Sequence, residues 1–396
     1  MMSSQLARFS GRAIVCTRLS TDFQSATEIV PIELAAATLK PHQVIVRNHW
    51  VGVNASDVNF TAGKYLGPGA KLPLRCGFEA VSEVVAVGSD ANVSPGDPVA
   101  ISSFGAFADY QVVNSSVLLP LPSLDPSYLP LVVSGLTASI GLKRVGEIKS
   151  GDVVLVTAAA GGTGQFAVQL AKAVGCTVIG TCSSPAKAAL LRRLGCDRPV
   201  NTSTESLDEI LRAEFPSGVD VVYESVGGET FTTAARHLAK GGRLVVIGFI
   251  SGYLLKTEAI PPPSGHGQSS PAVDLTASDL SISLLSRSAS VRGFFLPHFV
   301  ADVPEHFADL VRGVQTGQLS CGLDERCAGG EFEGLGAVGS AVEYLYSRQS
   351  AGKVFVSLDA SSASKFKQRK GSQGLSLNRA GRGIEDERAT VLQPRL

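Results

Sequence analysis

The run Val153-Val154-Leu155-Val156-Thr157-Ala158-Ala159-Ala160-Gly161-Gly162-Thr163-Gly164-Gln165 decides the fold of this chain. A buried strand leads into a glycine-rich turn, and a helix is expected to begin at about Thr163. Small residues in such a turn let the backbone approach a pyrophosphate, whose charge is stabilised by free N–H groups at the positive end of the helix. The pattern predicts a dinucleotide-binding turn, with Ala159 in place of the usual first glycine. Its phosphate-binding residues are expected to be Gly161, Gly162, Thr163 and Gly164.

The sequence on either side of this turn predicts two kinds of domain. After Ser150, strand-like runs at Thr177–Thr181, Val219–Glu224 and Arg243–Gly248 alternate with helical patterns, which is typical of a parallel, doubly wound sheet. Residues 13–113 instead contain short β-rich runs between Gly, Pro and Asn-Asp turn clusters, which predict an irregular β-barrel. The expected fold class is α/β, a β-barrel domain joined to a doubly wound sheet domain.

Three stretches lack the pattern of a packed domain. Residues 1–12 are interpreted as a frayed terminus. Residues 257–280 are rich in Pro, Gly and Ser and predict a mobile surface loop that flanks the site. Residues 361–396 hold eight Lys and Arg against three acids, a difference of +5, and predict a disordered tail.

Composition narrows the class of partner. The chain has 396 residues, of which 44% are hydrophobic and 18% charged, enough for two large cores. Lys and Arg number 35 and so do Asp and Glu, so no net charge attracts nucleic acid or an anionic membrane. Seven cysteines without a C-x-x-C pair favour a reducing compartment, and no apolar run reaches the roughly 18 residues that span a bilayer. A small-molecule partner is expected.

The adenosine end of the dinucleotide site favours NADPH. Enzymes that use NAD usually carry an acid about 20 residues past the glycines, and this chain has no Asp or Glu between Gly164 and Asp197. A carboxylate would repel a 2′-phosphate, whereas Ser183 and Lys187 can hold one. The alternative for Lys187 is a solvated charge on the first turn of a helix.

Four motifs together resemble the quinone-oxidoreductase branch of the medium-chain dehydrogenase/reductase superfamily. They are Gly52-Val53-Asn54-Ala55-Ser56-Asp57, Gly77-Phe78-Glu79, Ala159–Gly164 and Tyr223-Glu224-Ser225-Val226-Gly227-Gly228. Within that branch, residues 156–166 and 246–253 are most similar to the prostaglandin reductase 3 subfamily. The resemblance implies a GroES-like catalytic domain over residues 13–140 and 300–358, a Rossmann domain over residues 141–299, and a tail over residues 359–396.

The resemblance also implies where NADPH binds. Two positions depart from the family pattern, because Thr202 stands where relatives have a tyrosine and Ser350 where they have an asparagine. The implied cofactor contacts are Thr163, Ser183, Lys187, Thr202, Ser225, Ile247, Tyr253, Phe294, Phe295, Leu296 and Ser350.

The resemblance further implies a site without metal. The cysteine, histidine and cysteine that bind zinc in alcohol dehydrogenases of this superfamily fall here on Asn54, Phe78 and Val133, none of which is a usual zinc ligand. Without a Lewis acid, hydride addition is easier at the distal carbon of a conjugated enone, where charge develops on an enolate oxygen. That oxygen needs hydrogen-bond donors in a water-poor cleft.

Tyr253 and Asn54 are the predicted catalytic residues. Tyr253 follows a strand at the edge where α/β sheets bind ligands; the alternative is a tyrosine that only packs its ring locally. Asn54 and Ser56 are expected to orient the substrate or the cofactor amide. Apolar walls are expected from Phe60, Tyr65, Phe294 and Phe295, although such aromatics are more often core residues. His49, His237, His298 and His306 have no placed partner and are assigned no catalytic role.

Three functions follow from these residues. The first is NADPH-dependent reduction of the carbon–carbon double bond of α,β-unsaturated ketones such as 15-oxo-prostaglandins, a lipid enone substrate. The second is quinone reduction at the same cofactor site. The third is NADPH binding without turnover. The resemblance also implies a homodimer.

The ending Pro394-Arg395-Leu396 resembles the basic-Leu form of a peroxisomal address, with Pro394 in place of the usual small residue. A fluorescent reporter that carries the tail is expected to enter peroxisomes, and deletion of Leu396 is expected to return it to the cytosol. Equal cytosolic signal from both reporters would contradict this expectation, which leaves cytoplasm and mitochondrion as the alternatives.

Overall fold

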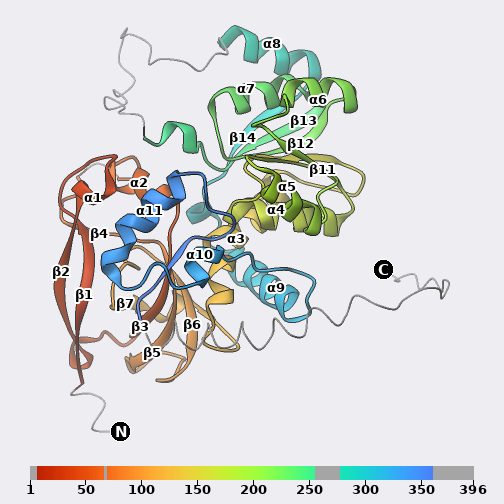
Figure 1. The fold of residues 1–396 in the computed structure, drawn as a ribbon. Helices are drawn as coiled ribbons and strands as arrows, with labels where there is room; N and C mark the ends of the chain where they lie inside the picture. The colour runs from red at the N-terminus through yellow and green to blue at the C-terminus, as the bar shows by residue number, and fades with distance from the viewer. Residues whose placement is uncertain (1–6, 67–68, 255–276, 360–396) are drawn as a thin grey trace, which may run out of the picture.

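The computed structural model describes residues 7–66, 69–254 and 277–359. Figure 1 shows two lobes, a β-barrel that begins the chain and a parallel sheet covered by helices. The ends of the chain and residues 255–276 lie outside the described residues, so the expected terminal tail and most of the expected loop 257–280 lie outside them as well. No helix in the described part of the chain is both long and apolar enough to cross a bilayer.

The first lobe is antiparallel, as the alternating β-rich runs predict. Its main sheet has the order β15-β3-β5-β6-β8, with β7 also paired to β3. The C-terminal strand β15 pairs antiparallel with β3, so that Phe355 lies opposite Gly52. A separate sheet has the order β2-β1-β4. The strands are β1 (Arg8–Cys16), β2 (Thr27–Ala35), β3 (Gln43–Gly52), β4 (Leu74–Arg75), β5 (Glu79–Val87), β6 (Pro98–Ser102), β7 (Tyr110–Asn114), β8 (Leu118–Pro120) and β15 (Phe355–Ser357).

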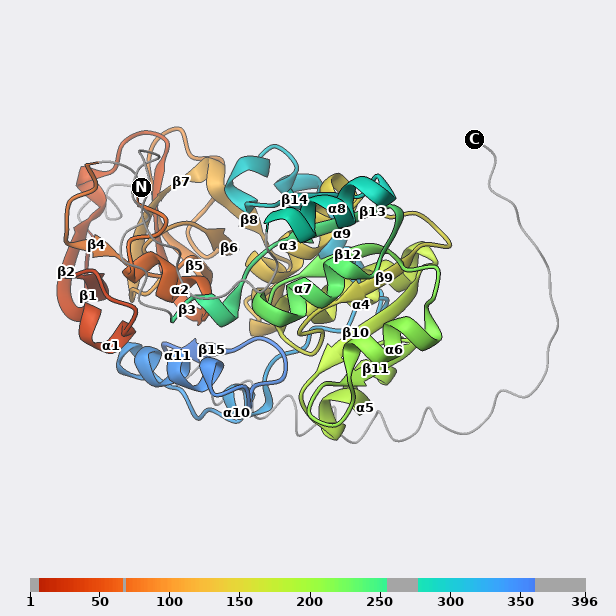
Figure 2. The same ribbon diagram turned by 90° about the horizontal axis from the view of Figure 1, so that it is seen from above.

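The second lobe is a six-stranded parallel sheet in the order β11-β10-β9-β12-β13-β14. This confirms the predicted doubly wound fold, because the chain winds outward from β9 in both directions. The helices lie over the two faces of the sheet (Figure 2). The strands are β9 (Val153–Val156), β10 (Thr177–Cys182), β11 (Arg198–Asn201), β12 (Val219–Glu224), β13 (Leu238–Val246) and β14 (Ser290–Gly293).

Alternation along β9 shows why both faces are covered. Val154 and Val156 belong to a core that includes α3 and α4, whereas Leu155 belongs to a second core with α6 and α7. The central strand β9 therefore buries both faces, which is why it reads as a continuous apolar run. The helices are α3 (Val133–Ile140), α4 (Gly162–Val174), α5 (Pro185–Arg193), α6 (Leu207–Glu214), α7 (Gly228–Arg236), α8 (Ala277–Arg287) and α9 (Val303–Gln315), with α1 (Phe23–Ala26), α2 (Ser56–Thr61), α10 (Glu325–Ala328) and α11 (Val338–Tyr346) in or against the barrel.

The structure moves several predicted boundaries. The first strand begins at Arg8 rather than Ala13, because Arg8 already pairs with Ala35 of β2. The strands β11 and β14 were not predicted: both are short edge strands, and Pro199 within β11 is tolerated only at such an edge. Helix α8 begins at Ala277, inside the segment expected to be a loop up to residue 280.

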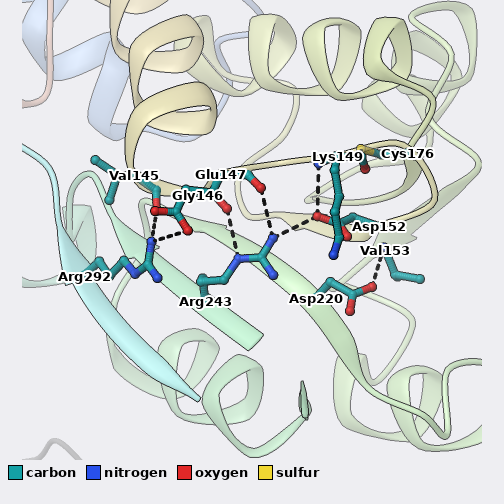
Figure 3. Close-up of polar contacts among 10 residues, drawn as sticks. All are labelled: Val145, Gly146, Glu147, Lys149, Asp152, Val153, Cys176, Asp220, Arg243 and Arg292. Carbon is teal, nitrogen blue, oxygen red and sulfur yellow. Dashed lines mark hydrogen bonds and ion pairs between the residues drawn. The ribbon is translucent and has the colours of Figure 1, made fainter. Parts of the chain in front are cut away.

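The predicted domain boundary after residue 140 falls inside one continuous helical segment. Helix α3 runs directly into a π-helical turn, Gly141–Val145, which leads to β9. Two arginines of the parallel sheet bind the carbonyl groups that end this turn (Figure 3). Arg243 donates to the carbonyl of Gly146 at 3.0 Å, and Arg292 donates to the carbonyl of Val145 at 2.8 Å. Helix-end carbonyls lack partners within the helix, so these bonds hold the connection between the lobes.

Arg243 also forms a buried ion pair with Asp152 at 2.8 Å, where the Asp152 side chain is only 4% exposed. Replacing Arg243 by Met leaves that carboxylate buried without its cation, so we expect the free energy of unfolding of the sheet domain to fall by about 3 kcal/mol. The change is measured by denaturant unfolding followed by far-UV circular dichroism. The matched control is Arg212→Met, which removes a side chain 68% exposed and should cost less than about 0.5 kcal/mol. Equal costs for the two variants would contradict the role of Arg243.

Candidate functional site

The site begins where the sheet reverses its winding, at the carboxyl ends of β9 and β12. Open α/β sheets bind ligands at this point because the loops from the two strands diverge. Here Thr157 and Ser225 are joined by two hydrogen bonds between side chain and backbone. The Ser225 amide donates to Thr157 Oγ1 at 2.8 Å, and Ser225 Oγ donates to the Thr157 carbonyl at 3.2 Å. The predicted contact Ser225 thus stands at the floor of the crevice, next to the glycine turn.

The glycine turn has the shape that a pyrophosphate needs. Helix α4 begins at Gly162, and its first N–H groups have no partner within the helix, so they are available to an anion. A side chain at Gly164 would place its Cβ 2.6 Å from the Ala158 carbonyl oxygen, so only glycine lets the helix approach the turn this closely. The turn itself is formed by Ala158, whose φ of 46° lies in the left-handed region.

The departure at Ala159 is compensated by the neighbouring strand. The Ala159 side chain is fully buried. A Cβ at Gly180 of β10 would lie 3.0 Å from the Ala159 methyl group. The glycine at position 180 therefore leaves space for this methyl group, which a glycine at position 159 would not have. The turn therefore fits a dinucleotide despite the substitution.

The structure brings Ser183 and Lys187 together at the end of β10. Lys187 Nζ donates to Ser183 Oγ at 3.4 Å and to the carbonyl of Arg348 at 2.7 Å. Arg348, which contributes this backbone carbonyl, is exposed and was not predicted from the sequence. Burial lowers the pKa of Lys187 below its usual value, so the amine is partly shielded and not a freely solvated surface charge.

The acids close to this end in sequence are committed elsewhere. Asp197 binds Lys172 at 2.8 Å and the Val178 amide at 2.7 Å, at the opposite end of β10. Glu205 accepts the Asn201 amide at 2.8 Å and pairs with Arg198. Neither carboxylate is bonded to Ser183 or Lys187, so the pair remains suited to a 2′-phosphate.

The other predicted cofactor contacts lie around the same crevice with different local roles. Thr202 is bound to the Cys182 carbonyl through both its amide (2.9 Å) and its hydroxyl (3.1 Å), which joins β11 to β10. Ile247, Phe294, Phe295 and Leu296 line one cavity, described below. Ser350 is half-buried on the segment that leads into β15. The turn after β12 is shaped by Glu224, whose Oε1 accepts the Val226 and Gly227 amides at 2.9 Å each.

Two contacts hold the lobes together across the crevice. The Gly352 amide donates to the Ala160 carbonyl at 2.9 Å, so the glycine turn is attached directly to the C-terminal strand of the barrel. Lys64 of the barrel donates to the carbonyls of Gly252 and Tyr253 at 3.4 and 3.3 Å. The phosphate-binding turn and the barrel are therefore fixed relative to each other at both sides of the site.

A buried ion pair lies beneath the site, between Lys353 and Glu79. The two side chains are 2% and 0% exposed. Asn54 completes the cluster: its Oδ1 accepts from Lys353 Nζ at 2.6 Å, and its Nδ2 donates to Glu79 Oε1 at 2.9 Å. Glu79 Oε2 accepts the Val133 amide at 2.8 Å. The amide group of Asn54, predicted to orient the substrate, is thus occupied on both sides and positions its neighbours.

Glu79 enters the sequence-based predictions only as part of a motif, and Lys353 does not enter them. No local pattern marks a lysine before a C-terminal strand as buried. The available signal was Gly52, because a Cβ at this position would collide with the carboxyl group of Glu79. A glycine inside a strand often indicates such a close approach.

This cluster occupies the region between the three positions that hold zinc in related dehydrogenases. Asn54 binds Lys353 and Glu79, the Val133 amide binds Glu79, and Phe78 lines the cavity. Within the described residues, no three His, Cys, Asp or Glu side chains come close enough to hold a metal ion. The donor set is a salt bridge and an amide, which satisfy each other.

Tyr253 is buried, and its hydroxyl is part of a chain of hydrogen bonds. The Tyr253 oxygen accepts the Phe249 amide at 3.2 Å, and the Tyr65 side chain lies close enough to interact with the same hydroxyl. Tyr65 in turn accepts from Asn59 Nδ2 at 3.0 Å. Burial raises the pKa of Tyr253 well above its usual value, so this hydroxyl keeps its proton. The Tyr253 ring also packs locally against Phe249, with 4.6 Å between ring centres, and its catalytic role stays a prediction.

Beside these hydroxyls lies a cavity of about 790 Å³. Both lobes contribute to its walls, with Tyr65, Phe78 and Val133 from one side of the crevice and Ile247 and Phe294 from the other. The predicted wall residues Tyr65, Phe294 and Phe295 line the cavity, and so does Ser56. Phe60 does not line it: Phe60 is 5% exposed and packs against Phe78 and Phe104.

The four histidines set aside by the sequence analysis form local contacts, and none is among the described residues that line the cavity. His237 Nε2 lies 2.8 Å from Asp208, His306 Nδ1 lies 2.7 Å from Ser139 Oγ, His298 packs edge-on against Phe295, and His49 lies 3.5 Å from Glu83.

Known proteins share both lobes and their connection. Residues 40–123 match the family model of the alcohol dehydrogenase GroES-like domain, and residues 162–312 match that of the zinc-binding dehydrogenase. The chain superposes on quinone oxidoreductase of Escherichia coli complexed with NADPH with a TM-score of 0.72 at 25% identity, covering 88% of this chain and 100% of the other. The chain belongs to the medium-chain dehydrogenase/reductase superfamily.

Within the superfamily, two relatives match almost end to end. The chain is 47% identical to prostaglandin reductase-3 of Bos taurus over 360 residues, which are 89% of this chain and 91% of that protein. It is 45% identical to a probable quinone oxidoreductase of Leishmania amazonensis over 342 residues, 86% of this chain and 96% of that protein. The predicted family and its branch are confirmed.

The pair Ser183–Lys187 generates a test of cofactor choice. Lys187→Ala removes the cation expected at the 2′-phosphate, so the Kd for NADPH should rise about ten- to a hundredfold while that for NADH changes little. Titration of cofactor fluorescence measures both constants. Lys187→Arg keeps the charge and Lys240→Ala removes an exposed lysine elsewhere, so both should retain tight NADPH binding. Equal weakening of NADPH and NADH by Lys187→Ala would show that Lys187 acts only through its bond to Arg348.

Proposed function

We propose that this protein reduces the carbon–carbon double bond of α,β-unsaturated ketones. NADPH is the cofactor, and it supplies the hydride when bound in the crevice. The single observation that carries the proposal is the Tyr65 hydroxyl, which belongs to a side chain that lines the cavity. Its oxygen accepts Asn59 Nδ2 at 3.0 Å and interacts with the Tyr253 hydroxyl, so its own proton can be donated to a substrate oxygen.

The chemistry requires such a donor. When hydride reaches the distal carbon of an enone, negative charge develops on the carbonyl oxygen, and a positioned O–H group stabilises this charge. The Tyr253 oxygen already accepts the Phe249 amide, which leaves the Tyr253 proton for Tyr65. Tyr253 is therefore proposed as the residue that holds Tyr65, and Tyr65 as the catalytic residue that contacts the substrate.

The surroundings of Tyr65 support reduction in a water-poor site. The Tyr65 ring packs on Phe295 at 5.6 Å between ring centres, and Phe294 stacks on Phe299 at 4.9 Å. Apolar walls exclude water and strengthen each hydrogen bond to a developing charge. Beneath them, the neutralised cluster of Asn54, Glu79 and Lys353 fixes the barrel strands and leaves no unpaired charge from this cluster at the reaction centre.

The finer substrate assignment rests on the similarity to prostaglandin reductase-3. We infer that lipid enones of the 15-oxo-prostaglandin kind are substrates, with reduction at the double bond conjugated to the oxo group. Quinone reduction is the second candidate, and it is favoured by the 45% identity to a probable quinone oxidoreductase. The two share the cofactor site, so product analysis separates them: a saturated ketone from an enone, or a hydroquinone from a quinone.

Two further proposals concern the oligomeric state and the location of the protein. A homodimer is proposed from the superfamily resemblance, and light scattering of the purified protein tests it. A peroxisomal location is proposed from the sequence ending alone, and the reporter described above tests it.

The role of Tyr65 predicts a specific loss of turnover. Tyr65→Phe is expected to lower kcat for enone reduction by about a hundredfold, because one donor to the developing oxyanion is lost, while the Kd for NADPH stays unchanged. NADPH oxidation and mass analysis of the saturated product measure the effect. Tyr110→Phe is the matched control, since Tyr110 packs against Phe9 in the barrel. Wild-type kcat in Tyr65→Phe would contradict the proposal, and NADPH binding without turnover of any enone or quinone would indicate a binding protein.

A further inference from the structure

The described walls of the cavity beside Tyr65 are formed by apolar side chains and by side chains with hydroxyl groups. No Asp, Glu, Lys, Arg or His occurs among the described residues that line its volume of about 790 Å³, and Tyr65 is the only titratable side chain among them. The polar groups on the described walls are hydroxyls of Ser, Thr and Tyr. A volume of this order holds a ligand of drug or lipid size, which ordinarily meets at least one charged anchor if it carries a charge itself.

Two lysines near the site are already engaged. Lys64, which precedes Tyr65, donates to the carbonyls of Gly252 and Tyr253 and lies 5.8 Å from the centre of the Phe249 ring. Lys353 is paired with Glu79 and bonded to Asn54. Neither ammonium group is available to an anionic chain end inside the cavity.

Glu305 and His306 on α9 adjoin wall residues in sequence, but Glu305 pairs with Lys143 and His306 is bonded to Ser139. A further titratable side chain close to the wall is His298. It packs edge-on against Phe295 at 5.3 Å between ring centres and is exposed to solvent. The Phe295 ring, which is part of the cavity wall, therefore lies between the imidazole and the cavity. His298 is the group that a test of charge preference has to control.

We propose that this cavity is a subsite for an uncharged alkyl chain and that it rejects a chain that ends in an ionised carboxylate. The inference rests on the proposed enone reductase function and adds the selection of its substrates. An enone with one charged and one uncharged chain binds with the uncharged chain in the cavity and the charged chain directed to solvent. An enone whose only long chain ends in a carboxylate has no such choice.

The size of the effect follows from the chemistry of the carboxyl group. A buried carboxylate without a partner is protonated instead of remaining charged. An alkanoic carboxyl group resembles the Glu side chain, whose pKa is about 4.3, so protonation near neutral pH can cost a factor of up to about 500. Partial solvent access at the cavity mouth reduces this factor. We expect kcat/KM for the methyl ester to exceed that for the free acid by more than about tenfold at neutral pH.

The experiment uses the full chain with NADPH and a linear enone that has a methyl group on the carbonyl side and one long chain on the other. The chain ends in a carboxylic acid, its methyl ester or its primary amide, and kcat/KM is measured for each between about pH 5.5 and 7.5. The ester and the amide are expected to be equivalent, and the acid is expected to approach them as the pH falls. The Kd values of the matching saturated ketones, from calorimetry, test the cavity without turnover.

Variants separate the cavity from general surface charge. Val117 lines the cavity and is 37% exposed, so it tolerates a longer side chain. Val117→Arg is expected to raise the acid-to-ester ratio of kcat/KM at least about fivefold, whereas Val117→Gln, of similar polarity without charge, leaves it unchanged. Val174→Arg places the same cation on the exposed end of α4 outside the cavity and is the second control.

The outcomes are distinct. An acid-to-ester ratio near one at neutral pH, or a pH trend that disappears in His298→Gln, overturns the proposed selection while enone reduction itself stands. If none of the three enones is turned over but the saturated ester still binds more tightly than the saturated acid, the proposed reaction is wrong and the charge selection of the cavity is supported. Equal binding of the two saturated ligands overturns the selection independently of turnover.

Discussion

The structure depends above all on the ion pair between Lys353 and Glu79, buried where the two lobes meet. A charge pair with 2% and 0% exposure is stable only when its hydrogen bonds are complete, because desolvation costs several kcal/mol for each ion. Completion comes from Asn54 and from the Val133 amide. The pair therefore requires that the C-terminal strand, the barrel and the start of α3 come together in one arrangement.

That requirement carries through to the cofactor crevice. Lys353 follows Gly352, whose amide binds the Ala160 carbonyl of the glycine turn at 2.9 Å. The same short segment thus contacts the barrel core on one side and the phosphate-binding turn on the other. Lys187 adds a second connection through the Arg348 carbonyl, only a few residues earlier in the chain. Residues 348–353 therefore connect the barrel core with the glycine turn and with Lys187.

Charge is distributed unequally along the crevice. The predicted adenosine end offers Lys187, partly shielded by burial, whereas the described walls of the cavity carry no ionisable group except Tyr65. In the proposed function, the cofactor is bound through charge and the substrate through apolar contact. Hydrogen bonds to the substrate would then come from a few hydroxyl and amide groups. Among these groups, Tyr65 interacts with both Asn59 and Tyr253.

The local sequence by itself determined the parallel sheet, the glycine turn, the absence of a carboxylate from the segment around Ser183 and Lys187, and the barrel of the first lobe. Each of these depends on periodicity or on neighbours within one strand-turn-helix unit. Only the tertiary structure decided that Asn54 is bound to Lys353, 299 positions away, and that Tyr65 belongs to the same hydroxyl chain as Tyr253. It also decided that the short edge strands β11 and β14 exist, since their pairing energy comes from neighbours rather than from their own sequence. The physical reason is the same in each case: burial and hydrogen-bond partners are properties of contacts between distant segments, and the residues that form them carry no local pattern.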